Sequence, residues 1–122
     1  DSYYKLGNFE EAAKCYGKVT ETDPLDIDIW LDYSAMLFEQ DETSRAISII
    51  SEGIKNNPEA AELYYRLVAY LFSDGQYNEA LNTLQHSLHT DPEKYELLFE
   101  YLPQLQDNKV IIDIINWYTR DR

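Results

Sequence analysis

Two histidines one helical turn apart are the first residues of this chain that could bind a metal ion. His86 and His89 are spaced i, i+3 and are followed by Asp91, so a helix would bring both imidazoles toward a carboxylate. Zinc sites use at least three protein ligands, and no third ligand lies at a useful spacing. Because both histidines fall on the outer face of the predicted helix, we expect surface residues and no metal site.

The single cysteine, Cys15, is a candidate nucleophile. A reactive thiolate needs an electropositive setting, yet neither a histidine nor a basic cluster lies near Cys15 in the sequence. The residue lies beside Tyr16 on an amphipathic stretch, which predicts a half-buried packing role instead. One cysteine also excludes an internal disulfide.

Acidic residues close together could supply an acid and a base for catalysis. The candidates are Glu10 with Glu11, Asp41 with Glu42, and Glu93. Each lies beside a turn signal at a predicted helix start, where negative charge interacts favourably with the helix dipole. The sequence also lacks a glycine-rich phosphate loop, a nucleophile elbow and an HExxH motif. It therefore predicts no catalytic residue, no cofactor and no enzyme.

These candidates belong to a sequence that repeats every 34 positions. Pro24, Pro58 and Pro92 follow one another at that spacing. The same offset relates apolar residues in the stretches between them: Trp30 with Tyr64, Tyr33 with Leu67, Ala35 with Ala69, Leu37 with Leu71, Ala46 with Ala80, Ile50 with Leu84, and Ile54 with Leu88. A fixed period of this length indicates stacked supersecondary units.

Each complete unit predicts two antiparallel helices. Two apolar stripes at helical spacing run through the first complete unit: Trp30, Tyr33 and Leu37, then Ala46, Ile50 and Ile54. Between the stripes, Asp41 in one unit and Gly75 in the next occupy the position of a left-handed residue after a helix. Connections this short produce a helical hairpin. No segment alternates polar and apolar residues for long enough to predict a strand.

In these recurring positions the chain resembles the tetratricopeptide repeat family. The resemblance rests on Trp30, Tyr33, Leu37, Ala46, Ile50 and Pro58 in one unit and on Tyr64, Leu67, Leu71, Gly75, Tyr77, Ala80, Leu84 and Pro92 in the next. It implies an all-α fold, a right-handed solenoid of antiparallel helix hairpins. The sequence departs from the family pattern at Val68, where the other unit has Ser34, and at Val19, where the complete units have Gly53 and Ser87.

The repeat pattern divides the chain into four parts within a single domain. Residues 1–26 form a partial repeat that lacks most of its first helix, residues 27–60 and 61–94 form complete repeats, and residues 95–122 form a degenerate capping hairpin. The half-helix would leave Tyr3 and Leu6 uncovered. We therefore expect a C-terminal fragment of a longer protein, with weak self-association through the truncated N-terminal edge. The tail also resembles the C-terminal end of some long, acidic bacterial proteins of this family, and that resemblance implies a bacterial source.

The tail keeps the repeat register only loosely. Pro103 cuts its first predicted helix short, residues 104–108 read as a polar connector, and residues 110–118 read as an apolar helix that contains Trp117. Stacked repeats need an end unit that covers the last apolar face. We expect this hairpin to close the stack.

Charge restricts the classes of partner. The chain has 10 Lys and Arg against 23 Asp and Glu, a net charge of −13. Nucleic acids and anionic membrane surfaces are bound through Lys and Arg, so both are disfavoured. No apolar run approaches the roughly 20 residues that span a bilayer. We expect a cytoplasmic protein with a protein or peptide partner.

The resemblance implies a peptide-binding concave face. The family positions that contact ligands correspond here to Asp28, Leu31, Ala35, Phe38 and Glu39, to Glu62, Tyr65, Ala69, Phe72 and Ser73, to Tyr4 and Lys5, and in the tail to Glu96 and Phe99. The set is an aromatic and aliphatic trough with acidic margins, which suits a peptide with apolar anchors and basic flanks. Phe38 and Phe72 have an alternative role, which is to pack between neighbouring helices.

The family includes modules that clamp the C-terminal carboxylates of chaperones with Lys and Asn side chains. The corresponding positions here hold Leu31, Ala35, Tyr65 and Ala69, which lack the donors for a carboxylate pair. The sequence therefore predicts a non-catalytic scaffold that binds another kind of segment. Two alternatives stay open: a structural, self-associating module of a longer protein, and the regulatory arm of an enzyme whose catalytic domain lies upstream.

Overall fold

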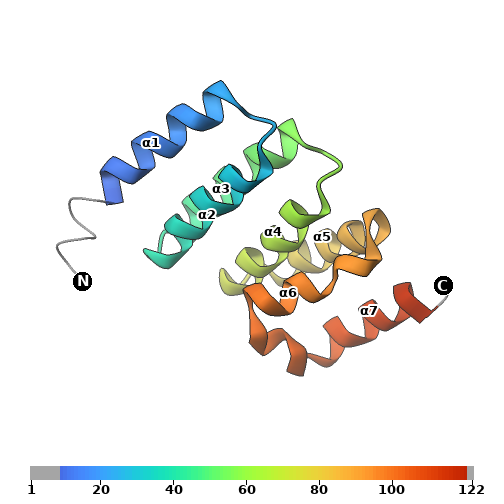
Figure 1. Cartoon of the computed structure of the whole chain (residues 1–122). Coiled ribbons are helices and arrows are strands. Elements are labelled where there is room, and N and C mark those ends of the chain that lie inside the picture. The colour runs from blue at the N-terminus through green and yellow to red at the C-terminus, as the bar shows by residue number, and fades with distance from the viewer. Residues whose placement is uncertain (1–8, 121–122) are drawn as a thin grey trace. The chain divides into compact units, whose positions relative to one another are not determined.

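A computed structural model describes residues 9–120, and all regular structure in that range is helical (Figure 1). The described range holds seven α-helices and two short 3-10 helices, and it contains no strand. The chain divides into two compact units, residues 1–58 and 59–122, which are described separately below. The predicted all-α class is thus confirmed.

The first unit contains a helix and a helical hairpin. Helix α1 spans Phe9–Thr22, α2 spans Ile27–Glu39 and α3 spans Thr43–Asn56, and the last two pair as the hairpin (Figure 1). Asp26 begins α2, because its carboxylate accepts a hydrogen bond from the backbone N–H of Asp28 at 3.1 Å. This N-cap satisfies one of the free donors at the helix start.

The turn between α2 and α3 has the geometry that the sequence predicts. Asp41 has a φ of 64°, and its N–H donates to the carbonyl of Phe38 while the N–H of Glu42 donates to the carbonyl of Leu37. These two bonds define a Schellman motif, which ends a helix with one left-handed residue. The aspartate thereby reverses the chain and produces the hairpin.

A tryptophan ties the connection between α1 and α2 to the end of α3. Trp30 is only 5% exposed, and its indole N–H donates to the carbonyl of Pro24 at 2.8 Å. The side-chain amide of Asn57 donates to the same carbonyl at 2.9 Å and to the carbonyl of Gly53 at 3.0 Å. The ring packs directly on Gly53, where an added Cβ would lie 2.7 Å from Cγ of Trp30. Glycine is therefore required for this close approach.

The second unit contains a hairpin and a more irregular tail. Helices α4 (Ala61–Ser73) and α5 (Tyr77–Thr90) form the hairpin, followed by η2 (Pro92–Lys94), α6 (Glu96–Tyr101), η3 (Pro103–Asp107) and α7 (Lys109–Arg120) (Figure 1). The α4–α5 turn is a second Schellman motif with Gly75 at φ 80°. Its bonds run from the N–H of Gly75 to the carbonyl of Phe72 and from the N–H of Gln76 to the carbonyl of Leu71.

The tail confirms two predictions and corrects one. Helix α6 ends just before Pro103, and α7 covers the predicted apolar helix. Residues 104–108, which the sequence predicts as a polar connector, lie largely in the 3-10 helix η3, and Leu105 within it is buried. A single leucine among polar residues gives no periodic signal, although its burial helps to anchor this segment.

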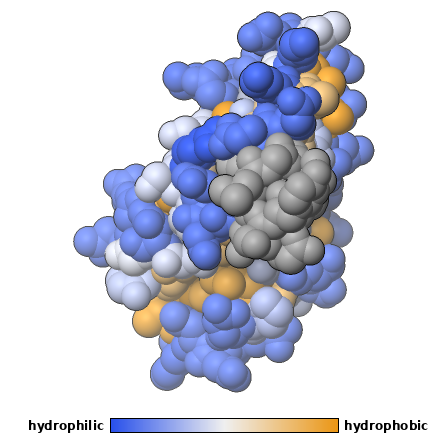
Figure 2. All heavy atoms as spheres, turned by 90° about the vertical axis from the view of Figure 1, so that its left-hand side faces the viewer, coloured by the Kyte–Doolittle hydropathy of each residue, from blue (hydrophilic) through white to orange (hydrophobic). Residues whose placement is uncertain are grey.

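The surface of the molecule is mainly hydrophilic on the side drawn in Figure 2. Apolar side chains form smaller areas on this face. From Phe9 to Arg120, no helix combines the length and the apolar character needed to cross a bilayer.

Candidate functional site

The predicted contact residues of the first unit lie along α2. Asp28 and Glu39 are exposed, whereas Leu31, Ala35 and Phe38 are half-buried. All five therefore keep surface through which α2 can be contacted. Tyr4 and Lys5 lie outside the described residues, as do Tyr3 and Leu6 of the predicted self-association edge.

The predicted contact residues of α4 separate into accessible and buried ones. Glu62 and Phe72 are half-buried and Ser73 is exposed, but Tyr65 and Ala69 are buried. The hydroxyl of Tyr65 donates to the carbonyl of Asp91 at 2.8 Å, and burial together with the charge of Asp91 raises the pKa of Tyr65 well above its ordinary value. Tyr65 and Ala69 thus belong to the core and are not available to a partner.

The ring of Phe72 makes a packing contact. Its centroid lies 5.5 Å from that of Tyr77, at the start of α5, with the rings tilted by 51°. Aromatic pairs at this separation stabilise a fold beyond their buried area. The contact favours the packing alternative for Phe72.

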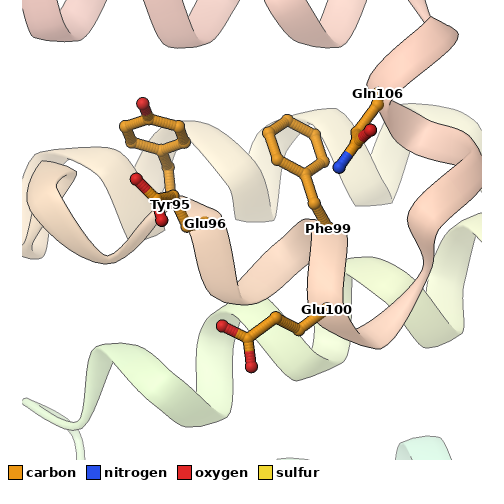
Figure 3. A pocket seen from close by; sticks show the side chains of 5 residues that line it. All are labelled: Tyr95, Glu96, Phe99, Glu100 and Gln106. Carbon is orange, nitrogen blue, oxygen red and sulfur yellow. The ribbon is translucent and has the colours of Figure 1, made fainter.

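The tail residue Phe99 belongs to an accessible pocket. Tyr95, Glu96, Phe99 and Glu100, together with Gln106 from η3, line a depression of about 430 Å³ (Figure 3). The two rings project to the same side of α6, and Gln106 points toward Phe99. The ring centroids are 6.2 Å apart and the ring planes meet edge to face at 78°. We call these five residues the α6 surface.

A second, more acidic depression adjoins the α6 surface. It has a volume of about 380 Å³, shares Glu96 and Glu100 with the first, and is lined also by Glu62, Glu93, Lys94 and Leu97. Its one cation is paired, because Nζ of Lys94 lies 2.7 Å from a carboxylate oxygen of Glu62. Three other carboxylates line the depression without a matching cation among its lining residues. The region is therefore electronegative.

The Glu62–Lys94 pair shifts the titration of both partners. Burial acts to raise the pKa of Glu62, but the hydrogen bond and the charge of Lys94 outweigh it, and the pKa lies below its ordinary value. The hydrogen bond to Glu62 correspondingly raises the pKa of Lys94. Both groups are therefore charged at neutral pH.

In the second unit, the cation of Arg66 already lies against aromatic rings. The guanidinium carbon of Arg66 lies 3.8 Å from the ring centroid of Tyr101, and its Nη1 donates to the hydroxyl of Tyr70 at 3.2 Å. Burial raises the pKa of Tyr101 despite this neighbouring positive charge. Such contacts stabilise a partly desolvated cation. The aromatic residues of α6 can offer an external cation the same chemistry.

Tyr95, Glu100 and Gln106 were not predicted from the sequence. A signal for the first two is present, because Tyr95 and Phe99 are spaced i, i+4, as are Glu96 and Glu100. At this spacing side chains share a helix face. Gln106 comes from η3, a segment whose structure the sequence did not predict.

The residues that suggested metal or thiol chemistry do not belong to the α6 surface. The ring of His86 lies 4.4 Å from that of Tyr64. Among the described residues, no three His, Cys, Asp or Glu side chains gather as a metal site would require. Cys15 is exposed, so the predicted half-buried packing role is wrong; its position on α1 faces away from the buried side marked by Ala13 and Thr20.

The fold and the sequence of this chain are each similar to those of known proteins. A solved structure described as the complex of the TPR2B domain of yeast Sti1 with pHsp70 superposes with a TM-score of 0.63. The match covers 99% of this chain and 90% of that chain at 19% identity, and it shows a shared helical-hairpin fold. No curated protein matches the sequence. The family model described as Tetratricopeptide repeat matches residues 3–70, more than half of the sequence, and the chain belongs to the tetratricopeptide repeat family.

Proposed function

We propose that this chain is a non-catalytic module that binds a protein or peptide segment, and that the α6 surface anchors the segment. The observation that carries the proposal is the pocket lined by Tyr95 and Phe99 together with Glu96 and Glu100. Figure 3 shows the two rings on one side of α6 and the side chain of Glu100 on the other. Aromatic side chains in a depression are the usual anchors of binding energy in protein interfaces. The membership of a family of helical repeats supports this reading.

The chemistry of the pocket favours a partner with a basic side chain. The aliphatic stem of a Lys or Arg can lie on an aromatic ring while its charged end reaches a carboxylate. Glu96 and Glu100 line the same pocket as the rings, Glu100 from the opposite side of α6, and the adjoining depression adds Glu93. The net charge of −13 would accelerate the approach of a cationic segment.

Each unit offers accessible predicted residues of its own, on α2 in the first unit and on α4 in the second. Asp28 and Glu39 are exposed acids on α2, and Ser73 is exposed at the end of α4. We propose that these residues offer further polar contacts to a basic partner. On α2 of the first unit, Leu31, Ala35 and Phe38 are half-buried and could supply apolar contacts.

The residues of this chain disfavour an acidic chain end as the partner. In this chain, the positions that would supply carboxylate donors hold the half-buried Leu31 and Ala35 and the buried Tyr65 and Ala69. An acidic chain end would meet no donors there and would be repelled by neighbouring carboxylates. We therefore propose a basic rather than an acidic segment.

The test uses three short fluorescein-labelled peptides that share two leucines and differ only in carrying Lys, Ser or Glu elsewhere. Fluorescence anisotropy should show the Lys peptide binding best and the Glu peptide not at all, with affinity falling as salt is added. Phe99→Ala and the double change of Glu96 and Glu100 to Gln should each weaken Lys-peptide binding about tenfold or more, as expected for loss of an anchor.

Two control variants remove similar groups elsewhere. Leu25→Ala truncates a side chain that is 70% exposed in the first unit, and Glu79→Gln neutralises an exposed acid on α5. Neither should change binding. Equal affinity for the Lys and Glu peptides, or an unchanged affinity in the α6 variants, would contradict the proposal.

A further inference from the structure

Exposed apolar side chains concentrate along one furrow of the second unit. Five large hydrophobic residues are exposed in the described chain, and three of them line this furrow: Tyr77 at 59%, Val110 at 53% and Trp117 at 58%. Two depressions mark it. One is lined by Phe72, Tyr77, Leu81, Asn108 and Val110, and the other by Gln85, Ile114, Trp117 and Tyr118.

The furrow runs between two helices. From α5 it receives Tyr77, Leu81 and Gln85, spaced i, i+4 and i+8, and from α7 it receives Val110, Ile114 and Trp117, spaced i, i+4 and i+7. Residues at these spacings form one stripe on a helix. We call these six residues the α5–α7 groove.

Helix α7 is apolar on two faces. Ile111 and Ile115 are buried against the rest of the unit, so they account for its attachment. The stripe of Val110, Ile114 and Trp117 is a second apolar face, on which Val110 and Trp117 are exposed and Ile114 is half-buried. A helix with an additional apolar face is suited to pack on another helix.

The charge of the groove helices narrows the choice of occupant. Two copies of a chain with net charge −13 repel each other over most of their surface. On α5 and α7, the acids Glu79 and Asp113 are balanced by Lys109 and Arg120. Nζ of Lys109 also lies 3.7 Å from Oδ2 of Asp113, so these two side chains form an ion pair. Two copies that meet along these helices bring no net charge together.

The stripe on α7 is also self-complementary. In a symmetric pair the same patch faces itself about a two-fold axis. If two α7 helices run antiparallel with Ile114 on the axis, the small Val110 of each copy faces the large Trp117 of the other. A small residue opposite a large one is the arrangement that fills an interface without voids.

We propose that the α5–α7 groove binds α7 of a second copy of this chain, with the two Ile114 side chains meeting on the two-fold axis. The proposal rests on the apolar stripe of α7, on the pairing of the small Val110 with the large Trp117, and on the balanced charges of α5 and α7. This self-association is independent of the α6 surface. It also differs from the N-terminal self-association that the sequence predicts, because it uses α5 and α7.

Charge pairs placed on the axis test the proposal. Analytical ultracentrifugation over a dilution series should show a monomer–dimer equilibrium for the unchanged chain. Ile114→Lys and Ile114→Glu each put like charges opposite one another, so each should raise the dimer dissociation constant at least about a hundredfold. An equimolar mixture of the two variants should dimerise again, because Lys then faces Glu.

Controls distinguish this interface from misfolding and from association through another surface. Circular dichroism should show both variants folded, and Phe99→Ala on the α6 surface should leave the dimer constant unchanged. Acrylamide quenching of Trp117 should fall as the unchanged protein is concentrated. The proposal is overturned by a monomer at every concentration, by variants that still dimerise, or by a mixture that stays monomeric.

Discussion

The hairpin α2–α3 and the hairpin α4–α5 share one repeat pattern but are held together differently. Both turns are Schellman motifs with a left-handed residue, Asp41 or Gly75. At the equivalent positions inside the hairpins, Trp30 packs on Gly53 in the first, whereas Tyr64 lies against His86 in the second. The repeat thus determines the helices and turns, while the side chains at the crossing are specific to each unit.

The two crossings differ in how tightly the aromatic residue is enclosed. Trp30 is buried and anchors its indole N–H on Pro24. Tyr64 is half-buried, and Ser87, which replaces Gly53 in register, donates its hydroxyl hydrogen bond to the carbonyl of Thr83 on its own helix. The first unit therefore depends on one large side chain more than the second does.

Removing the aromatic residue at the crossing should give the largest difference in stability between the two hairpins. Trp30→Ala should lower the free energy of unfolding by about 3–5 kcal/mol, because it leaves a buried cavity and removes a hydrogen bond to the carbonyl of Pro24. Tyr64→Ala should lower it by less, because the side chain is only half-buried. Guanidinium unfolding followed by circular dichroism measures both. Equal losses would show that the two crossings are equivalent after all.

Adding one methyl group tests the close approach itself. Gly53→Ala should destabilise by about 1–3 kcal/mol, because the new Cβ would meet the ring of Trp30 rather than a flexible chain end. Gly17→Ala is the matched control in α1, where an added Cβ meets nothing within 4 Å. It should stabilise by about 0.5–1 kcal/mol through helix propensity. Stabilisation by Gly53→Ala would contradict the packing described for Trp30.

Most of the secondary structure followed from the sequence because the repeat carries two redundant signals. The apolar stripes set the helix phase, and the positions of Asp41 and Gly75 predicted left-handed turns, which both residues adopt. Whether a given side chain is buried or accessible was harder to predict. Leu31 and Tyr65 share one repeat position, yet Tyr65 is fully buried because its hydroxyl reaches the carbonyl of Asp91.

The candidate site was predicted only in part, for a related reason. Phe99 and Glu96 came from family positions, but the pocket also needs Gln106, whose place depends on the 3-10 helix from Pro103 to Asp107. The burial of Leu105 anchors that helix. A contact of this kind depends on tertiary packing and leaves no period in the sequence.

The helix cap at the start of α2 can be removed, and the same cap can be introduced at the start of α4. Asp26 and Ala60 have nearly the same backbone angles, φ −85° and ψ 96° against φ −84° and ψ 94°, but only Asp26 caps its helix with a side chain. Asp26→Ala should therefore destabilise, and Ala60→Asp should stabilise, by about 0.5–2 kcal/mol each. Thermal unfolding of the two variants measures both signs. A loss of stability in Ala60→Asp would mean that its new charge beside Glu59 and Glu62 outweighs the cap.

The smallest expected difference is electrostatic and belongs to the second unit. The Glu62–Lys94 contact links α4 to η2, 32 positions apart, whereas the Lys55–Glu52 contact of the first unit joins exposed neighbours on one helix. Lys94→Gln should cost about 0.2–1 kcal/mol at pH 7 and low salt, and Lys55→Gln should cost less. High salt should reduce the effect of both.

The pH dependence of the Glu62–Lys94 pair follows from its two shifted pKa values. The pKa of Glu62 is lower than its ordinary 4.5, so the stabilisation is present above about pH 4.5 and is lost as the pH falls through the folded-state value. The pKa of Lys94 is higher than its ordinary 10.5, so its contribution is complete below that pH and is lost as the pH rises through the folded-state value. The stability difference between the unchanged chain and Lys94→Gln, measured by urea unfolding, should therefore be constant from about pH 5 to pH 10 and shrink in stronger acid. A difference that persists at pH 2 would assign the effect of Lys94 to packing of its aliphatic stem rather than to its charge.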